Sequence, residues 1–399
     1  MKIVIIHSAN NGFFPRFYKS LYNAIIQSGF NAFLLQPKNG INKRTPLPSQ
    51  ILFGTRLNWF IHYRLYKLTG LQDIWSFFET ISMLLKLNKI KPDIIHLHVV
   101  NECSINYPLL TFYTRHKKIP VVWTMHDCRA FTGRCAYFDE INCNKWITGC
   151  GNCPQNKLYS PTWIDNSAKQ WKIRKKLFNK FYSLYIITPS RWLANYVKKS
   201  FLKNNPCDVI YNGIDINLFS QLQPDTWLDT YNLRGKKIIL GVAGAWEKRK
   251  GFEYFIQLSK ELPQDYKIVL VGNIPHKINN IINIPKTSNS NILASLYQHS
   301  TIFCNPTLAD NFPTTNIEAL ASGTPVITFN TGGSPEAIDE TCGIVVAKGD
   351  YDALKNAIIY MANNQNLYTK KNCINRSHLF SNKQYLQYVE LYKKILRLI

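Results

Sequence analysis

The chain has 399 residues, which is long for one hydrophobic core and sufficient for two domains. Hydrophobic residues make up 46% of it, a share that is typical of globular proteins and excludes a disordered chain. The formal net charge of +24 indicates a partner that carries negative charge, such as nucleic acid, anionic lipid or a phosphorylated substrate. No run of about 18 apolar residues occurs, so we expect no membrane-spanning helix.

The positive charge is concentrated in the N-terminal part of the chain. Residues 1–234 hold 30 Lys and Arg against 12 Asp and Glu, a net +18, whereas residues 235–399 hold 18 against 12, a net +6. We therefore expect the anionic partner to bind the N-terminal part. The chain starts with a short aliphatic run that polar residues soon interrupt, so residues 2–6 are predicted to be a strand and not a signal peptide.

Gly12 follows this first strand in a short polar loop, and a helix is predicted over 13–28, with the next strand over 32–35. A strand that leads through a glycine-containing loop into a helix suits phosphate binding, because the helix N-terminus offers free N–H groups. The dinucleotide fingerprint with three glycines is absent. Gly12 is therefore a candidate residue on the phosphate side of a ligand.

The segment 56–68 mixes aromatic and basic side chains, among them Trp59, Tyr63, Arg64 and Lys67. One interpretation is a helix that lies on an anionic membrane surface. The other is a helix packed on the sheet, whose basic side chains extend along it into solvent. The sequence leaves both interpretations open.

Two predicted strands bring histidines to one edge of the first sheet. Residues 91–98 predict a buried strand in which His96 and His98 point to the same face. The strand over 120–124 then brings His126 to its carboxyl end, where open α/β sheets bind ligands. At that position a histidine either donates a hydrogen bond to a ligand and stabilises developing charge, or is a structural residue of the loop.

Five of the ten cysteines lie within residues 128–155. From Cys135 their spacing is C-x7-C-x6-C-x2-C, which includes Cys143, Cys150 and Cys153. Four thiolates with one C-x2-C pair are able to hold a structural zinc ion. Reduced core thiols and disulfides are the alternatives, although the length of the chain argues against a disulfide scaffold.

A second series of strands is predicted after the polar segment 217–235, which we interpret as a linker. The apolar run at 236–246 predicts the first of these strands, and the sequence EKRKGF follows it. It places Arg249 and Lys250 at a predicted helix start, where two cations suit a diphosphate. A basic surface turn is the alternative.

Residues 301–337 predict a strand, a loop, a helix, a second strand and a second loop. Asp310 lies in the first loop and Glu318 in the helix, for which Thr314 and Thr315 are the expected caps. The helix N-terminus suits a phosphate, and a carboxylate one turn deeper is placed to accept both hydroxyls of a ribose. The loop carboxylate then reaches a second polyol beyond the phosphate. This arrangement fits a sugar nucleotide, while an ordinary β–loop–α crossover is the alternative.

These motifs resemble those of the family-4 retaining glycosyltransferases of the GT-B fold. The sequence D-NFPTTNI-E-ALASGTPVI, which starts at Asp310, is similar to the donor-site motif of that family, in which Glu is common at the first position. R-K-G at 249–251 is similar to its phosphate-side motif, and T-M-H-D at 124–127 to the segment that carries its N-domain histidine. Residues 128–155 resemble the same part of bacterial glycosyltransferases of the colanic-acid and exopolysaccharide type.

The resemblance implies an α/β protein with two Rossmann-like parallel-sheet domains that face each other across a cleft. The N-terminal, acceptor-side domain is expected over 1–216, with the last helix, 383–399, packed back on it. The linker 217–235 and a nucleotide-sugar-binding domain over 236–382 follow.

The same resemblance implies an enzyme that transfers a hexose from a nucleoside-diphosphate sugar to a hydroxyl of a lipid-linked glycan, with retained configuration and without a catalytic metal or other cofactor. The setting implied is the synthesis of bacterial surface polysaccharide, either exopolysaccharide or lipopolysaccharide. We expect a cytoplasmic protein that attaches peripherally to the anionic inner face of the plasma membrane. A sugar-nucleotide epimerase on the same fold is one alternative. A basic nucleic-acid-binding protein is another, against which the absence of a helix-turn-helix, zinc-finger or RNP motif argues.

The resemblance also assigns roles to residues of the site. Lys250 and Arg249 are expected to hold the diphosphate, Glu318 the ribose and Asp310 the transferred sugar, which His126 approaches from the other domain. The remaining residues expected at the donor are Gly12, Asn311, Phe312, Pro313, Thr314 and Thr315.

Overall fold

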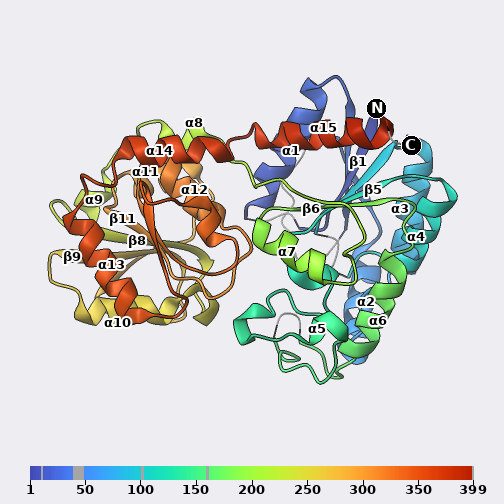
Figure 1. Ribbon diagram of the computed structural model, residues 1–399, viewed down its shortest axis with the longest axis horizontal. Helices are drawn as coiled ribbons and strands as arrows, with labels where there is room; N and C mark the ends of the chain where they lie inside the picture. The colour runs from blue at the N-terminus through green and yellow to red at the C-terminus, as the bar shows by residue number, and fades with distance from the viewer. Residues whose placement is uncertain (10–11, 39–48, 100–102, 159–160, 398–399) are drawn as a thin grey trace. The chain divides into compact units, whose positions relative to one another are not determined.

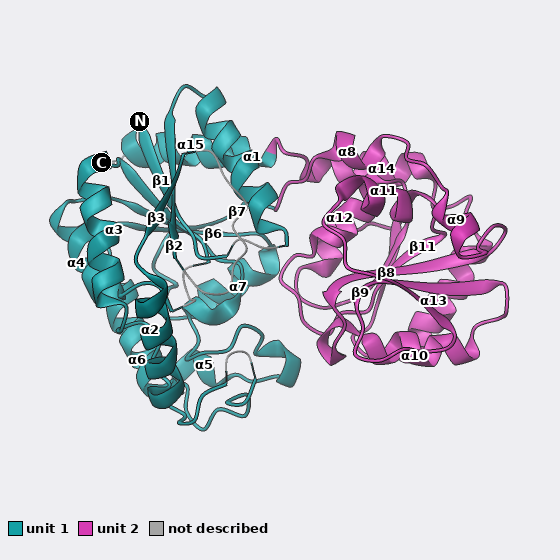
Figure 2. Ribbon diagram, turned by 180° about the vertical axis from the view of Figure 1, so that it is seen from behind, with its two compact units in different colours: residues 1–211, 384–399 teal, residues 212–383 magenta. Residues whose placement is uncertain are grey.

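The computed structural model describes residues 1–9, 12–38, 49–99, 103–158 and 161–397. Two compact units make up the chain. Unit 1 comprises residues 1–211 together with 384–399, and unit 2 comprises residues 212–383 (Figure 2). Each unit is built on its own parallel sheet.

The sheet of unit 1 has seven parallel strands in the order β3-β2-β1-β4-β5-β6-β7. Runs of Ile, Val and Leu form its central strands, because β-branched and large aliphatic side chains pack well on a sheet that is covered on both faces. The strands are β1 (Lys2–Ile6), β2 (Asn31–Pro37), β3 (Gln50–Phe53), β4 (Ile94–Leu97), β5 (Val121–Thr124), β6 (Leu184–Thr188) and β7 (Cys207–Val209).

The helices of unit 1 begin at polar caps in several places. The side chains of Thr55, Asn106 and Ser190 each accept a hydrogen bond from the backbone N–H three residues later, which stabilises the starts of α2, α4 and α7. The helices are α1 (Phe14–Gln27), α2 (Arg56–Thr69), α3 (Phe77–Ile90), α4 (Tyr107–His116), α5 (Lys145–Thr148), α6 (Ser167–Phe178), α7 (Arg191–Lys199) and α15 (Gln384–Arg397), with 3-10 turns η1 (Cys128–Ala130) and η2 (Asp139–Ile141).

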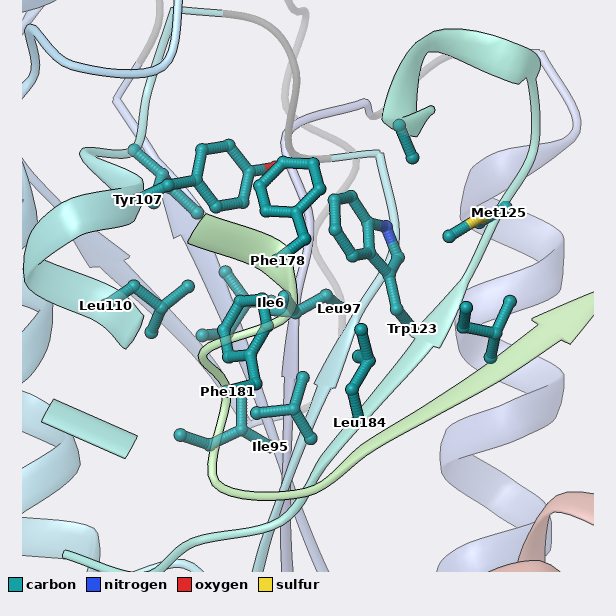
Figure 3. Close-up of a cluster of buried hydrophobic side chains, with 14 of the residues drawn as sticks. Ile6, Ile95, Leu97, Tyr107, Leu110, Trp123, Met125, Phe178, Phe181 and Leu184 are labelled. Atoms are coloured by element: carbon teal, nitrogen blue, oxygen red, sulfur yellow. The ribbon is translucent and has the colours of Figure 1, made fainter. Parts of the chain in front are cut away.

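Two apolar clusters hold these helices on the sheet. In one, the ring of Phe178 of α6 lies between Tyr107 of α4 and Trp123 of β5 (Figure 3). In the other, buried residues of α1 and α15 pack together and against the opposite side of the central strands. Figure 1 shows α1 and α15 side by side, so the last helix of the chain belongs to unit 1.

Unit 2 has six parallel strands in the order β10-β9-β8-β11-β12-β13. Its core joins Phe255 and Leu258 of α10 to Ile239, Leu270 and Ile302 of the sheet. The strands are β8 (Lys237–Ala245), β9 (Tyr266–Asn273), β10 (Ile281–Ile284), β11 (Ile302–Asn305), β12 (Val326–Phe329) and β13 (Gly343–Val346). The helices are α8 (Ile216–Ser220), α9 (Trp227–Thr230), α10 (Phe252–Glu261), α11 (Ser290–Gln298), α12 (Thr314–Ala321), α13 (Tyr351–Asn363) and α14 (Lys370–Ser377), with 3-10 turns η3 (Lys248–Lys250), η4 (Ser334–Ala337) and η5 (His378–Phe380).

Both sheets follow the Rossmann strand order, which confirms the predicted fold class of two Rossmann-like parallel-sheet domains. In each sheet the strand order reverses beside the first strand of the unit, between β1 and β4 in unit 1 and between β8 and β11 in unit 2. Open α/β sheets bind ligands outside the carboxyl ends of the strands at such a reversal. The loops that follow β1, β4, β8 and β11 are therefore where a site is expected.

The segment 217–235, predicted as a linker, lies within unit 2 and includes α9 and most of α8. Gln298 at the end of α11 is hydrogen-bonded to this segment. Its side-chain amide donates to the carbonyl oxygens of Phe219 and Gln221 at 2.7 and 2.8 Å. Hydrogen bonds from α11 thus hold this segment in place, although its polar composition resembles that of a flexible linker.

Candidate active site

The two loops at the strand-order reversal of unit 2 are bonded to each other. β8 leads into η3, and β11 leads into residues 306–313. The backbone N–H of Leu308 donates to the carbonyl oxygen of Arg249 at 2.7 Å, and Thr307 Oγ1 donates to the same oxygen at 3.2 Å. The structure therefore brings together the basic motif, residues 248–250, and the acidic loop, residues 306–313, which lie about 60 residues apart in the sequence.

Lys250 and Asp310 form an ion pair at this junction. Lys250 Nζ lies 2.6 Å from Asp310 Oδ2, and the two side chains are 24% and 15% exposed. The other carboxylate oxygen, Oδ1, accepts a hydrogen bond from the backbone N–H of Asn311 at 2.9 Å. The sequence predicted separate ligands for these two residues, and it gave no signal that they contact each other.

Arg249 is held against the same loop by its guanidinium group. Nη1 donates to the carbonyl oxygen of Ala309 at 3.0 Å, while Nε and Nη2 donate to Glu247 Oε1 at 3.0 and 2.7 Å. Gly251 follows with a φ of +78°, and a Cβ there would stand 2.2 Å from the carbonyl oxygen of Pro306. Glycine is thus required for the approach of the two loops.

α12 begins directly after the acidic loop. Its N-cap residue is Pro313, and no side chain caps it, so the prediction that Thr314 and Thr315 cap this helix is wrong. The two threonines are its first two helical residues, where N–H groups have no partner within a helix. Their side chains are half-buried, and the N-terminus of a helix suits an anionic group.

The loop after β12 packs against the acidic loop. The N–H of Gly333 donates to the carbonyl oxygen of Asn311 at 2.8 Å. Gly332 has a φ of +57°, and a Cβ at that position would lie 1.6 Å from the carbonyl oxygen of Asp310. Phe312 is buried against Phe380, with ring centroids 5.6 Å apart. The backbone that carries Asp310 is therefore closely packed.

Glu318 is buried within α12, with 3% of its surface exposed. The phenol of Tyr297 on α11 donates to Glu318 Oε2 at 3.4 Å. Tyr297 is a residue that the sequence did not point to, because it lies on another helix and no motif spacing connects it with Glu318.

In unit 1, His126 lies directly after β5 and is half-buried. Its Nε2 is 3.1 Å from Nδ1 of His98, and the ring of Phe14 at the start of α1 contacts it edge-on at 5.0 Å. Burial lowers the pKa of His126 to about 3, so the ring is neutral at pH 7. Gly12, with a φ of +57°, stands two residues before Phe14, while the rest of its predicted loop, residues 10–11, lies outside the described residues.

The cysteine-rich segment follows β5. Burial raises the pKa of Cys135 to about 12 and that of Cys150 to about 11, and neighbouring thiols add to both shifts. Within the described part of the chain, no group of three or more His, Cys, Asp or Glu side chains is placed to hold a metal ion. The structure thus gives the predicted zinc site at Cys135, Cys143, Cys150 and Cys153 no support.

The surface around α2 is apolar and basic. In α2 the side chains of His62 and Tyr66 are buried, whereas half of the other residues are exposed and the rest are half-buried. The guanidinium of Arg64 lies over the ring of Phe60 at 4.8 Å, and Lys67 Nζ lies 5.3 Å from the ring centre of Tyr63. The exposed apolar residues of this α2 surface are Leu57, Phe60, Ile61, Leu68, Phe77, Phe78, Trp163 and Ile164. None of the described helices is long and apolar enough to cross a bilayer.

Two family models match the chain. Residues 16–218 match the model described as Glycosyltransferase Family 4, and residues 225–378 match the one described as Glycosyl transferases group 1. A putative colanic acid biosynthesis glycosyl transferase, WcaC of Escherichia coli (strain K12), is 26% identical over 270 residues, which are 64% of this chain and 64% of that protein. The chain thus spans less than two thirds of the length of this curated relative.

Solved structures show the same fold. Sucrose-phosphate synthase (tll1590) from Thermosynechococcus elongatus has a TM-score of 0.71 and 18% identity, and the match covers 100% of both chains. Anabaena Alr3699/HepE, solved in complex with UDP-glucose, has a TM-score of 0.67 and 13% identity, also over 100% of both chains.

Proposed function

Because this chain belongs to glycosyltransferase family 4, we propose that it transfers a sugar from a nucleoside-diphosphate sugar to a hydroxyl group of a glycan in the synthesis of bacterial surface polysaccharide. Two similarities support the proposal. The relative WcaC is named for colanic acid biosynthesis, and Alr3699/HepE, which shares the fold, was solved with UDP-glucose. The observation that carries it is the junction of η3 with the loop 306–313.

This junction has the charge that a diphosphate needs. Lys250 and Arg249 supply two cations, and the N-terminus of α12 supplies N–H groups and the positive end of a helix dipole. The diphosphate binds to these groups, which take the place of a metal ion. Glu318, one turn into α12, accepts the ribose hydroxyls, and Asp310 accepts a hydroxyl of the transferred sugar. Asn311, Phe312 and Pro313 shape the loop between them.

The reaction proceeds with retained configuration by attack from the face of the leaving group. The bond between the anomeric carbon and the diphosphate oxygen breaks while the acceptor oxygen bonds to that carbon. The proton of the acceptor hydroxyl passes to the departing phosphate. Lys250 and Arg249 stabilise the charge that develops on the phosphate, so catalysis consists of positioning and charge neutralisation. For unit 1, the proposal assigns His126 as a hydrogen-bond donor to the sugar and Gly12 as a residue on the phosphate side.

The acceptor is a glycan on a lipid carrier, and the enzyme reaches it at the anionic inner face of the plasma membrane. The α2 surface supports this part of the proposal. It joins exposed aromatic side chains to cations, and α2 contains no acidic residue. Aromatic rings enter the interface of a bilayer while the cations contact lipid phosphates.

Thermal-shift screening with UDP-, GDP- and ADP-sugars tests donor binding, because a ligand that binds the folded state stabilises it by mass action. The true donor should raise the Tm of the wild-type protein and of Lys260→Ala, which changes an exposed lysine elsewhere in unit 2. Lys250→Ala should lose most of the shift. A protein that no sugar nucleotide stabilises contradicts the proposal. Conversion of the sugar nucleotide without an acceptor would instead identify an epimerase.

Sedimentation with vesicles tests membrane attachment. Vesicles that contain phosphatidylglycerol should carry down the protein, and added salt should release it. The double variants Phe60→Ser/Phe78→Ser and Arg64→Gln/Lys67→Gln should both bind less. Leu222→Ser, which changes an exposed apolar residue of unit 2, is the matched control. Equal sedimentation with purely phosphatidylcholine vesicles would contradict an electrostatic mechanism.

A further inference from the structure

Four histidines gather at the carboxyl edge of the sheet in unit 1, although the proposed function uses only one of them. His7 follows β1, His96 lies in β4, His98 follows β4 and His126 follows β5. The rings of His96 and His98 lie 4.1 Å apart, and His98 Nδ1 lies 3.1 Å from His126 Nε2. His7, His96 and His98 are fully buried.

The hydrogen bonds of His96 fix the proton on its ring. Thr124 Oγ1 donates to the phenol oxygen of Tyr388 at 3.3 Å, so it accepts from Nε2–H of His96 at 2.8 Å. Nδ1 of His96 therefore carries a lone pair, which accepts from the phenol of Tyr392 at 2.6 Å. Both phenols belong to α15. The last helix of the chain therefore fixes the orientation of the His96 ring, against which His98 packs.

The ring of His98 is held on several sides. Phe17 and Tyr18 of α1 contact it edge-on at 5.1 and 5.3 Å, and His96 covers it at 4.1 Å. Among the described residues, the ring of His98 is hydrogen-bonded to His126 through Nδ1. Its other ring nitrogen, Nε2, is buried and has no partner among those residues.

The position of the proton in the pair follows from that unpartnered nitrogen. If His126 donated from Nε2, Nδ1 of His98 would be the acceptor and the proton of His98 would lie on the buried Nε2. A buried N–H without an acceptor is more costly than a buried lone pair. If His98 donates from Nδ1, its Nε2 keeps only a lone pair, and His126 carries its own proton on Nδ1.

We propose that His98 is a positioning residue, which donates from Nδ1 to Nε2 of His126 and so keeps His126 as a hydrogen-bond donor through its Nδ1–H. Burial lowers the pKa of both rings, so the pair is neutral at pH 7. Nδ1 of His126 makes no hydrogen bond to any described residue, and the ring is half-buried. That this N–H donates to the donor sugar rests on the proposed function, whereas the arrangement of the two protons does not.

Nitrogen NMR of the full chain, labelled with ¹⁵N-histidine, tests the arrangement directly. Long-range couplings distinguish a protonated from an unprotonated ring nitrogen. In the wild-type protein His126 should show a protonated Nδ1 and an unprotonated Nε2, and His98 the same pattern. A protonated Nε2 on His126 would overturn the inference and leave the proposed function untouched.

The variant His98→Phe removes the donor and keeps an aromatic ring in the buried site. It should convert His126 into a mixture of tautomers and lower kcat by about tenfold, the effect of one hydrogen bond, with little change in donor KM. His98→Asn, whose amide supplies a donor near the position of Nδ1, should restore most of kcat. The exposed His116→Gln is the control.

Two results separate the inference from the proposed function. If His126 in the His98→Phe variant stays wholly in the Nδ1–H form, His98 does not set its tautomer and the inference is overturned. If the wild-type tautomers are as expected but no sugar nucleotide binds, the proposed function fails and the inference stands. The wild-type spectrum provides the decisive result even if His98→Phe does not fold.

Discussion

Lys250 Nζ and Asp310 Oδ2 lie 2.6 Å apart, although the two residues are assigned to different parts of the donor. In the proposed function, the phosphate draws Lys250 away from this ion pair, and the sugar hydroxyl approaches the same carboxylate. Because both side chains are partly exposed, the pair itself contributes little to the stability of the fold. In the proposed function, the ion pair therefore holds the two groups in place until the ligand binds.

Lys250→Ala should lower kcat by about a hundredfold or more, because in the proposed reaction Lys250 faces charge that grows as the bond to the leaving phosphate breaks. Asp310→Asn keeps the shape of the side chain and should also act mainly on kcat, for sugars with the contacted hydroxyl. Asp310→Glu, the residue common in the family, is the informative control. Steady-state kinetics with the true donor measure these effects. Near-wild-type kcat in both Lys250→Ala and Asp310→Asn would show that the site is wrongly assigned.

Gly332→Ala should displace the backbone of Asp310, because its Cβ would lie 1.6 Å from that carbonyl oxygen. We expect kcat/KM to fall by more than about tenfold, a loss that corresponds to a modest misplacement of the site. Gly235→Ala is the matched control in the same unit, since Gly235 has a similar positive φ of +73° and nothing within 4 Å of an added Cβ. Equal activity of the two variants would contradict the role of this close contact.

The sequence predicted the architecture because its strands are short apolar runs and its turns carry Gly, Asn and Pro. The strands β1, β5 and β8 and the helix α1 lie where these patterns put them. β3, α4 and β10 were not predicted. The part of the chain before β3 is largely polar, and the packing of α4 on Trp123 is a tertiary contact with no local signal.

The candidate site was predicted as a set of residues and not as a geometry. Motif spacing indicated Arg249, Lys250, Asp310 and Glu318, and parallel strand order explains why the first three meet. Their partners came from elsewhere in the fold. The phenol of Tyr297 belongs to another helix, and the carbonyl of Ala309 is a backbone group that no side-chain pattern reveals.

Glu318→Gln should raise the donor KM more than it lowers kcat, because the ribose does not change during the reaction. The amide keeps the shape of the side chain but accepts hydroxyl hydrogen bonds less strongly than a carboxylate. Tyr297→Phe removes the phenol that donates to Glu318 and keeps the carboxylate, so it is the matched control, with little effect on kcat expected. A pure kcat effect in Glu318→Gln would contradict the assignment to the ribose.

The buried ion pair of Asp73 and Arg174 should be far more important to stability than an exposed one. Arg174 donates to both carboxylate oxygens of Asp73 at 2.7 and 3.0 Å, and both side chains are at most 1% exposed. Arg174→Met leaves the carboxylate buried without its cation, although Gln170 still donates to Oδ2, and this should cost about 3–5 kcal/mol in urea unfolding. Arg234→Met breaks exposed ion pairs with Asp225 and Asp229, which solvent screens, and should therefore cost much less. Similar losses in both would contradict the argument.

Acid should destabilise the protein through its buried histidines. Burial lowers the pKa of His7 to about 4 and those of His96 and His98 well below their usual value of 6.5, so these rings stay neutral in the fold while the unfolded chain protonates them. Their contribution is therefore fully present above pH 6.5 and is lost as pH falls toward about 4, at about 1.4 kcal/mol per pH unit for each ring.

Urea unfolding between about pH 7 and about pH 5 measures this slope. His98→Phe removes one buried histidine. The free energy of unfolding of this variant should therefore depend less steeply on pH than that of the wild-type protein, by about 1.4 kcal/mol per pH unit. His116→Gln changes an exposed histidine and should leave the steep dependence in place. If His98→Phe followed the wild-type slope, then His98 would be protonated in the fold as readily as in the unfolded chain, and the neutral pair with His126 would fail with it.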